Sequence, residues 1–273
     1  MTHYHRSWRR TIMTKLHQVI TAATLATMLA TGAIAQAATI PFTENFEDGV
    51  ANGFTPTGSW AVGANAVLDN LAYTNTNAGA TASSVTQFTN LYDNGGFTAS
   101  YDFVINSATG PGSGYTVDMG WYLGSTTGTA SPVYLLDFLV SADSAANLNN
   151  RGRLRIIELN TSNQTIASGD FFNQGSNFQT GVRYTTTITA AYDSGANELT
   201  LSLSVTDGTT TVTTSGVDTT PQLGGWLGFR NRTASGSSNI SFDNLNVSVI
   251  PEPASLALMG LAGVLIAWPR RRK

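Results

Sequence analysis

The segment between residues 38 and 250 holds few side chains that could do chemistry. It contains no cysteine, histidine or lysine, and its charged residues are 16 carboxylates and six arginines, a net charge of −10. These absences exclude catalysis by a Ser-His-Asp triad or a cysteine nucleophile, and an ordinary zinc site. Hydrolysis by a pair of carboxylates remains compatible with the composition. The acidic balance predicts no general affinity for nucleic acid or anionic lipid.

Two carboxylates near the ends of this segment are candidate ligands for a metal ion. Glu47 lies in the acidic stretch 43–49, and Asp243 lies in the stretch 242–245. This pairing resembles that of jelly-roll carbohydrate-binding modules, in which an early Glu and a late Asp hold a structural calcium ion. The resemblance implies a calcium site formed by these two residues, since calcium prefers hard oxygen ligands. The alternative is that both are ordinary solvated carboxylates.

A break in the residue pattern supports an unusual backbone at Asp243. Ile240 and Phe242 fall on one face of the predicted last strand, whereas Leu245 and Val247 fall on the other. Such a slip predicts a β-bulge at residues 243–244, and a bulge can turn a carboxylate toward an ion.

A second candidate site is a polar face formed by two predicted strands. Alternation places Asp118 and Tyr122 on the non-core side of one strand, and Trp226 and Arg230 on the non-core side of another. An exposed aromatic ring can stack on a sugar ring, while Asp and Arg hydrogen-bond to its hydroxyls. We therefore predict an open glycan-binding face made by these four side chains. The alternative is that loops or neighbouring strands cover them.

A third pattern is a row of cations at every second position, formed by Arg151, Arg153 and Arg155. Alternate residues of a strand share a face, so the three arginines could hold the carboxylates of an acidic polysaccharide. The preferred interpretation is a solvated strand face whose arginines pair with nearby acids such as Asp137 or Glu158.

The rest of the segment predicts an all-β fold. Apolar and polar residues alternate strictly in 97–105, 115–123, 184–192 and 199–206, and the run 133–140 predicts a fully buried central strand. Residues 193–197 predict a hairpin loop. We expect an antiparallel two-sheet sandwich over residues 38–249, between an N-terminal signal helix (1–37) and a C-terminal tail (250–273) with a transmembrane helix over 254–268.

Five short pieces, in their order along the chain, resemble the concanavalin A-like, laminin-G-type jelly roll. They are residues 179–185, 191–193, 197–201, 224–230 and 240–247. The resemblance implies a jelly-roll sandwich of a kind used for sugar binding, protein binding and hydrolysis, so the fold alone does not decide the function. The sequence lacks the Glu-x-Asp-x-Glu strand signature of the laminarinase-like jelly-roll glycosidases.

The N-terminal 37 residues have the layout of a secretory signal peptide. Basic residues between positions 6 and 15 precede an apolar stretch, 19–34, which is followed by small-x-small cleavage sites ending at Ala35 and Ala37. Cleavage after Ala37 is favoured. Met13 is an alternative start, because a complete signal follows it.

The C-terminal tail is a second targeting segment. The triplet Pro251-Glu252-Pro253 precedes an uncharged apolar run, 254–268, and a basic end, 270–273. This order resembles the PEP-CTERM sorting tail. The resemblance implies transient retention in the inner membrane with the C-terminus cytoplasmic, and recognition of the triplet by an exosortase-type membrane protease. Release would then deliver the protein to the cell surface or the exopolysaccharide matrix.

Together these features favour an exported, non-enzymatic surface or matrix protein that binds an extracellular polysaccharide. The alternative is a secreted jelly-roll glycoside hydrolase or polysaccharide lyase. Two close, partly buried carboxylates in a groove would favour the enzyme. A polar face with aromatic side chains and no such pair would favour the binding protein. Apart from calcium, no cofactor is expected.

Overall fold

The computed structural model describes residues 37–109, 117–124, 132–140, 153–159, 164–170, 178–233 and 236–250. The predicted signal peptide through residue 36, the sorting tail from residue 251 and Arg151 lie outside these ranges. Within the ranges, the structure contains no helix that is long and apolar enough to cross a membrane.

The described strands form two antiparallel sheets, one of eight strands and one of seven. The eight-stranded sheet contains β1 (Phe42–Glu44), β3 (Trp60–Asn65), β4 (Asn70–Ala78), β6 (Gly96–Thr109), β11 (Arg183–Asp193), β12 (Glu198–Thr206), β13 (Thr211–Asp218) and β15 (Ser237–Val249). The seven-stranded sheet contains β2 (Thr55–Thr57), β5 (Thr81–Gln87), β7 (Val117–Gly124), β8 (Pro132–Val140), β9 (Arg153–Glu158), β10 (Gln164–Asp170) and β14 (Trp226–Thr233).

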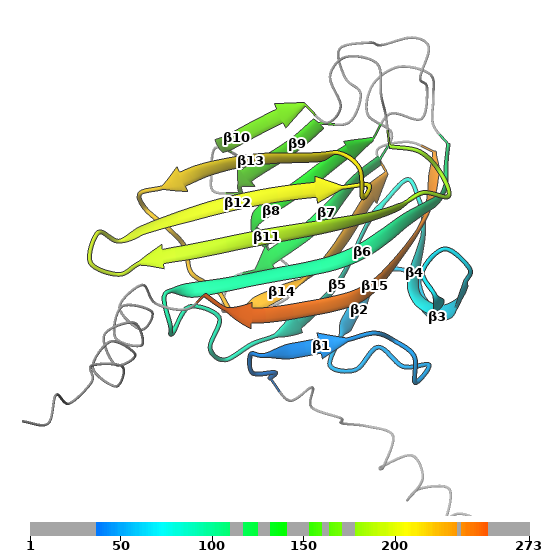
Figure 1. Ribbon diagram of the computed structural model, residues 1–273, viewed down its shortest axis with the longest axis horizontal. Coiled ribbons are helices and arrows are strands. Elements are labelled where there is room, and N and C mark those ends of the chain that lie inside the picture. Colours follow the sequence, from blue (N-terminus) through cyan, green and yellow to red (C-terminus); the bar gives the residue numbers. More distant parts are fainter. Residues whose placement is uncertain are drawn as a thin grey trace, which may run out of the picture. The chain divides into compact units, whose positions relative to one another are not determined.

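The last two strands occupy the middle of the two sheets. The order in the larger sheet is β13-β12-β11-β6-β15-β4-β3, with β1 beside β15, and the order in the smaller sheet is β10-β9-β8-β7-β14-β5-β2. Strand β15 therefore lies between β6 and β4, and β14 lies between β7 and β5, which is a jelly-roll connection (Figure 1). The predicted all-β, two-sheet jelly-roll sandwich is confirmed.

The core lies between the sheets and is made of the residues that alternation placed there. Apart from the half-buried Tyr192, the inward-pointing members of the four alternating runs whose side chains are described are buried, among them Phe97, Tyr101, Trp121, Tyr184, Leu199 and Leu203. Trp121 donates its indole N–H to Thr186 Oγ1 at 3.1 Å, so the polar edge of this large ring is satisfied inside the core. Strand β8 is buried from Val133 to Phe138 and has a strand on each side, as predicted.

Two local predictions of backbone geometry are also confirmed. Residues 194–197 form the turn between β11 and β12, and Asp193 Oδ1 accepts hydrogen bonds from the backbone N–H groups of Gly195 and Ala196 at 2.8 and 3.1 Å. The register of β15 against β6 slips between Asp243 and Asn246, and Asn244 has a φ of 54°. This bulge returns the apolar residues that follow it to the core.

Candidate functional site

The four predicted binding residues share the outer face of the seven-stranded sheet. Strands β7 and β14 pair antiparallel, with Tyr122 opposite Gly228 and Arg230 opposite Gly120. The intervening residues of both strands belong to the core: Met119, Trp121, Leu123, Leu227 and Phe229. Because side chains alternate between the faces of a strand, the four binding candidates project away from this core. The structure thus brings together the residues that the sequence analysis grouped.

The expectation of an open face is wrong for two of the four residues. Tyr122 is only 2% exposed and Arg230 only 6% exposed, whereas Trp226 and Asp118 are partly exposed. Burial raises the pKa of the Tyr122 hydroxyl to about 12. A flat platform of exposed rings is therefore absent from the described part of this face.

Gly124 explains how the two aromatic residues come together. A Cβ atom at this position would lie 2.6 Å from Tyr122 Cε1 and 2.9 Å from Trp226 Cβ, distances that real Cβ atoms do not show. Glycine in a strand commonly marks such a close approach. The run Trp121-Tyr-Leu-Gly124 therefore supplies both a core ring and the space in which Tyr122 and Trp226 pack.

Arg230 is buried because it belongs to a group of ion pairs, which we call the arginine–aspartate cluster: Asp118, Asp137, Arg155, Arg230 and Arg232. Arg230 Nη1 lies 3.0 Å from Asp118 Oδ1 and 3.3 Å from Asp137 Oδ1. Arg155 Nη2 lies 2.8 Å from Asp137 Oδ2 and 3.6 Å from Asp118 Oδ2. Arg232 Nη1 lies 3.7 Å from Asp118 Oδ2. Four strands, β7, β8, β9 and β14, contribute to the cluster.

Strand register assembles the cluster. Arg155 on β9 is directly opposite Asp137 on β8, Asp137 is opposite Gly120 on β7, and Gly120 is opposite Arg230 on β14. A Cβ at Gly120, whose φ is 153°, would lie 2.2 Å from the Leu136 carbonyl oxygen. Since Gly120 has no side chain, Arg230 reaches across β7 to Asp137.

Asp137 is the most deeply buried charge of the cluster. It has no exposed surface, and its two oxygens face Arg155 and Arg230. Burial first, and then the neighbouring Asp118 carboxylate, raise the pKa of Asp137 to about 8, against the opposing effect of the two arginines. The preferred interpretation of the arginine row, pairing with Asp137, is confirmed for Arg155.

The pair Asp118 and Asp137 bears on the choice between an enzyme and a binding protein. Two close carboxylates are present, and this is the feature that would favour hydrolysis. A general acid or base must, however, come within hydrogen-bonding distance of the reacting group. Asp137 cannot do so in this structure, because it is fully buried and both of its oxygens contact arginines.

Among the described residues, three buried polar atoms of this face have no hydrogen-bond partner. They are Trp226 Nε1, Arg155 Nε and Asp118 Oδ1, the last lying near Arg230 without hydrogen-bond alignment. The described part of the chain contains only two other such side-chain atoms, Thr86 Oγ1 and Tyr101 OH. Native proteins rarely leave buried polar atoms unpaired unless water, an ion or a ligand serves them. Three of the five unpaired atoms thus belong to side chains of this face, where they lie beneath its surface.

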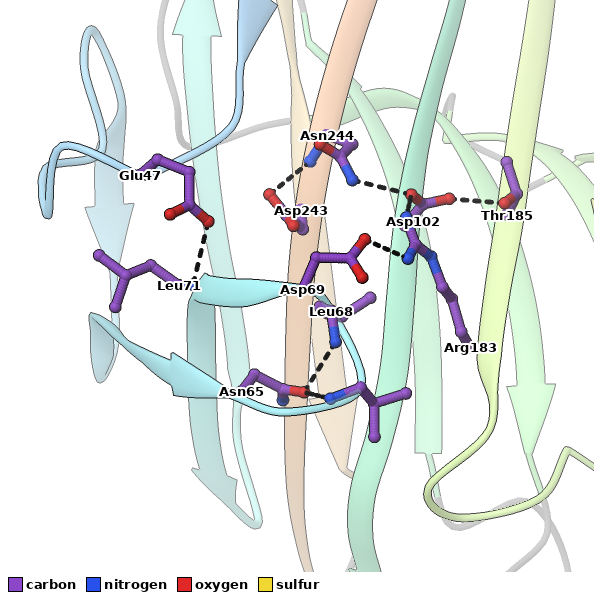
Figure 2. A network of polar contacts seen from close by, with 11 residues as sticks. Glu47, Asn65, Leu68, Asp69, Leu71, Asp102, Arg183, Thr185, Asp243 and Asn244 are labelled. Atoms are coloured by element: carbon purple, nitrogen blue, oxygen red, sulfur yellow. Dashed lines mark hydrogen bonds and ion pairs between the residues drawn. The ribbon is translucent and has the colours of Figure 1, made fainter.

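Of the predicted metal ligands, Asp243 lies on β15 of the other sheet and Glu47 lies in the turn after β1, both in the network drawn in Figure 2. Glu47 Oε2 accepts a hydrogen bond from Asn70 Nδ2 at 2.7 Å, and its Oε1 accepts one from the Leu71 backbone N–H at 3.1 Å. Asp243 Oδ1 accepts the Asn244 backbone N–H at 2.7 Å. Glu47 therefore fixes the start of β4, while Asp243 sits in the bulge of β15.

Asp243 is buried among carboxylates. It is 2% exposed, and burial raises its pKa to about 6, with further upward contributions from Asp102 and Glu47. Asp102 is well satisfied, because it accepts hydrogen bonds from Arg183, Thr185 and Asn244 (Figure 2).

These contacts give a calcium ion little support. No group of three or more His, Cys, Asp or Glu side chains in the described ranges is placed to hold an ion, and both oxygens of Glu47 already accept hydrogen bonds. An ion at Asp243 would need amide or main-chain oxygens as its other ligands. Calcium binding by Glu47 and Asp243 stays a prediction.

Two features near the bulge escaped the sequence analysis. Glu44, rather than Glu47, is the buried early glutamate, and its two oxygens accept the backbone N–H groups of Phe46 at 2.8 Å and Asn52 at 3.1 Å. An open pocket of about 290 Å³ lies between β1 and the bulge, lined by Thr43, Glu44, Asn45, Asn244, Leu245 and Asn246. Its amide residues carried no sequence signal because asparagine is frequent throughout the chain.

Comparisons with known proteins find likenesses of structure alone. No protein-family profile and no curated protein matches the sequence. Lectin I-B4 from Griffonia simplicifolia is 16% identical, with 77% of this chain and all of the lectin covered and a TM-score of 0.46. The winged bean acidic lectin, solved with methyl-α-D-galactose, is 11% identical over 76% of this chain and 98% of its own, with a TM-score of 0.48.

A carbohydrate esterase from the Shiga toxin-encoding bacteriophage phi24B is 16% identical over 76% of this chain and 98% of its own, with a TM-score of 0.44. Likenesses with TM-scores below 0.5 carry no functional argument, and these include both binding proteins and an enzyme. The evidence for the function therefore lies in the residues of the chain itself.

Proposed function

We propose that this chain is an exported, non-enzymatic protein whose sandwich binds an extracellular glycan on the outer face of the seven-stranded sheet. The observation that carries the proposal is the composition of that face. It combines the partly exposed Trp226 ring with the accessible charged side chains of Arg155 and Arg232. A sugar can engage both kinds of group, since its hydroxyls accept hydrogen bonds from arginine N–H groups and its C–H face packs on an aromatic ring.

The side chains available in this segment favour binding over hydrolysis. Residues 38–250 have no histidine, cysteine or lysine. On the proposed binding face, the carboxylate whose pKa is raised, Asp137, lies beneath the surface and contacts two arginines. A jelly-roll hydrolase or lyase is the second candidate, and the proximity of Asp118 to the Asp137 site is the observation in its favour.

We propose a route by which the chain is exported and sorted from the sequences of its N- and C-terminal segments. A signal peptide would export the chain, and the tail with Pro251-Glu252-Pro253 would hold it briefly in the inner membrane for an exosortase-type protease. The sandwich would then act at the cell surface or in the polysaccharide matrix.

A glycan-array screen of the purified chain tests the binding proposal. Trp226→Ala should remove most of the signal, because the ring is only partly buried and its loss leaves the inner core intact. Trp226→Phe keeps an aromatic ring but removes the indole N–H, so it should retain part of the binding. Unchanged binding in Trp226→Ala would place the glycan site elsewhere, and no binding to any glycan would overturn the proposal.

A further inference from the structure

Among the described residues, positive charge is confined almost entirely to one of the two sheets. The five described arginines of the segment 38–250 divide unequally, with Arg183 on the eight-stranded sheet and the other four on the seven-stranded sheet. Those four are Arg153 and Arg155 on β9, and Arg230 and Arg232 on β14. The segment as a whole carries a net charge of −10. A local excess of cations in such a background indicates selection for an anionic ligand rather than general adhesion.

The arginine–aspartate cluster is not charge-balanced. Three guanidinium groups face two carboxylates, which leaves an excess of one positive charge when both aspartates are ionised. An anion bound beside the cluster would neutralise the excess.

Two arginines of the cluster have donor capacity to spare. The side chain of Arg232 is 51% exposed, and its contact with Asp118 at 3.7 Å is longer than a hydrogen bond. The side chain of Arg155 is 26% exposed, and its described contacts with Asp137 and Asp118 both involve Nη2. Arginine has five N–H donors in a planar fork that matches the two oxygens of a carboxylate.

The same face places an aromatic ring in line with these donors. Trp226, Arg230 and Arg232 occupy alternate positions of β14 and so point to one side of the sheet. Trp226 and Arg232 are six residues apart, roughly 20 Å along the strand, and β9 with Arg155 lies three strands away, at roughly 14 Å. A ligand that engages both the ring and the cations must be an extended chain.

We propose that this face binds a polyuronate, a polysaccharide whose sugar units carry carboxylates, with Arg232 and Arg155 binding carboxylates and Trp226 stacking on a sugar ring. This inference rests on the proposed glycan-binding function and names its ligand class. Charge complementarity identifies the occupant, since the acidic remainder of the chain would repel a polyanion from every other described surface.

A matched pair of polymers tests the ligand class. Binding of the purified chain to polygalacturonate should exceed its binding to the fully methyl-esterified polymer by about tenfold, because esterification removes the charge and keeps the backbone. Raising the salt concentration from 0.1 to 1 M shortens the screening length from about 10 to about 3 Å, so it should weaken binding to the acidic polymer alone.

A matched pair of variants tests the site. Arg232→Gln should reduce polygalacturonate affinity about tenfold, and Arg232→Lys should restore part of the loss. Arg183→Gln, which removes the same charge from the other sheet, should bind like the wild type. Melting curves establish that each variant is folded, and the salt dependence of the wild type stands without any variant.

The outcomes separate this inference from the proposed function. Equal binding of the acidic and esterified polymers, binding to dextran sulfate but not to polygalacturonate, or equal losses in Arg232→Gln and Arg183→Gln would overturn the polyuronate assignment while leaving glycan binding in place. Failure to bind any polysaccharide would overturn both.

Discussion

Replacing Arg230 by methionine tests the buried arginine–aspartate cluster beneath the proposed binding face. Arg230 is 6% exposed and contacts Asp118 at 3.0 Å and Asp137 at 3.3 Å. Methionine keeps an unbranched apolar stem but removes the charge. Asp137, which has no exposed surface, would then retain only Arg155 as a close cationic partner.

The expected cost follows from leaving a buried charge undercompensated. Removing one partner of a buried ion pair typically destabilises a protein by about 3–5 kcal/mol. For a domain of this size each kcal/mol lowers the melting temperature by about 2–4 °C, so Arg230→Met should melt at least 6 °C below the wild type. Arg232→Met is the matched control, because its side chain is 51% exposed and such pairs contribute about 0–1 kcal/mol.

The pH dependence of this loss identifies Asp137 as its origin. The folded-state pKa of Asp137 is already raised to about 8, and losing Arg230 raises it further, since that arginine lowers it. A carboxylate whose pKa is higher in the folded state stabilises folding at low pH, and this contribution is lost as pH rises through the folded-state pKa. The deficit of Arg230→Met should therefore be larger at pH 8 than at pH 5.

Urea unfolding of the wild type and the two variants at pH 5 and pH 8 measures these quantities, with Asp137→Asn/Arg230→Met as the rescuing double variant. A loss of stability in Arg230→Met no larger than that in Arg232→Met would contradict this prediction. The prediction also fails if the deficit of Arg230→Met is independent of pH, or if Asp137→Asn deepens the loss.

Three further predictions concern the other sheet and the tail. In chelator, Asp243→Asn should be about 2–3 kcal/mol more stable than wild type at pH 8 and equal to it near pH 4, because the raised folded-state pKa of about 6 penalises the ionised group only as pH rises; urea melts showing no gain at pH 8 would contradict this. If Glu47 and Asp243 hold calcium, the ion at a hundred times its dissociation constant should add about 2.7 kcal/mol, and Asp243→Ala should abolish that gain; identical melting curves with calcium and chelator would end the idea. Glu252→Ala should leave export intact but retain the full-length chain in the inner membrane on fractionation. If this variant instead reached the surface as efficiently as the wild type, the triplet would not be a recognition signal.

Local pattern was enough to predict the sandwich and its core. Apolar and polar residues alternate in strands such as 97–105 and 199–206 because one face of each strand is buried between the sheets. This periodicity can be recognised from consecutive residues alone. The bulge at 243–244 was equally local, since a slip in alternation must be absorbed by the backbone where it occurs.

The environment of the binding candidates was not local, and there the sequence analysis went wrong. Alternation gave the side on which Tyr122 and Arg230 point, but not what lies beside them. Arg230 is buried because β8 presents Asp137 two strands away, at a register that only the assembled sheet defines. Part of the signal was available, because an aspartate inside the apolar run 133–140 requires a buried cationic partner. The glycines at positions 120 and 124 likewise marked a close approach within a strand.

The most direct test of the central claim, glycan binding without turnover, is to titrate the purified chain with the best-binding polysaccharide and assay the same samples for new reducing ends. We expect saturable binding in the micromolar to millimolar range, roughly −8 to −4 kcal/mol, which is lost in Trp226→Ala and accompanied by no reducing-end release. Release of reducing ends by the wild-type chain, abolished in Asp118→Asn, would contradict the account and identify the face as the active site of a hydrolase.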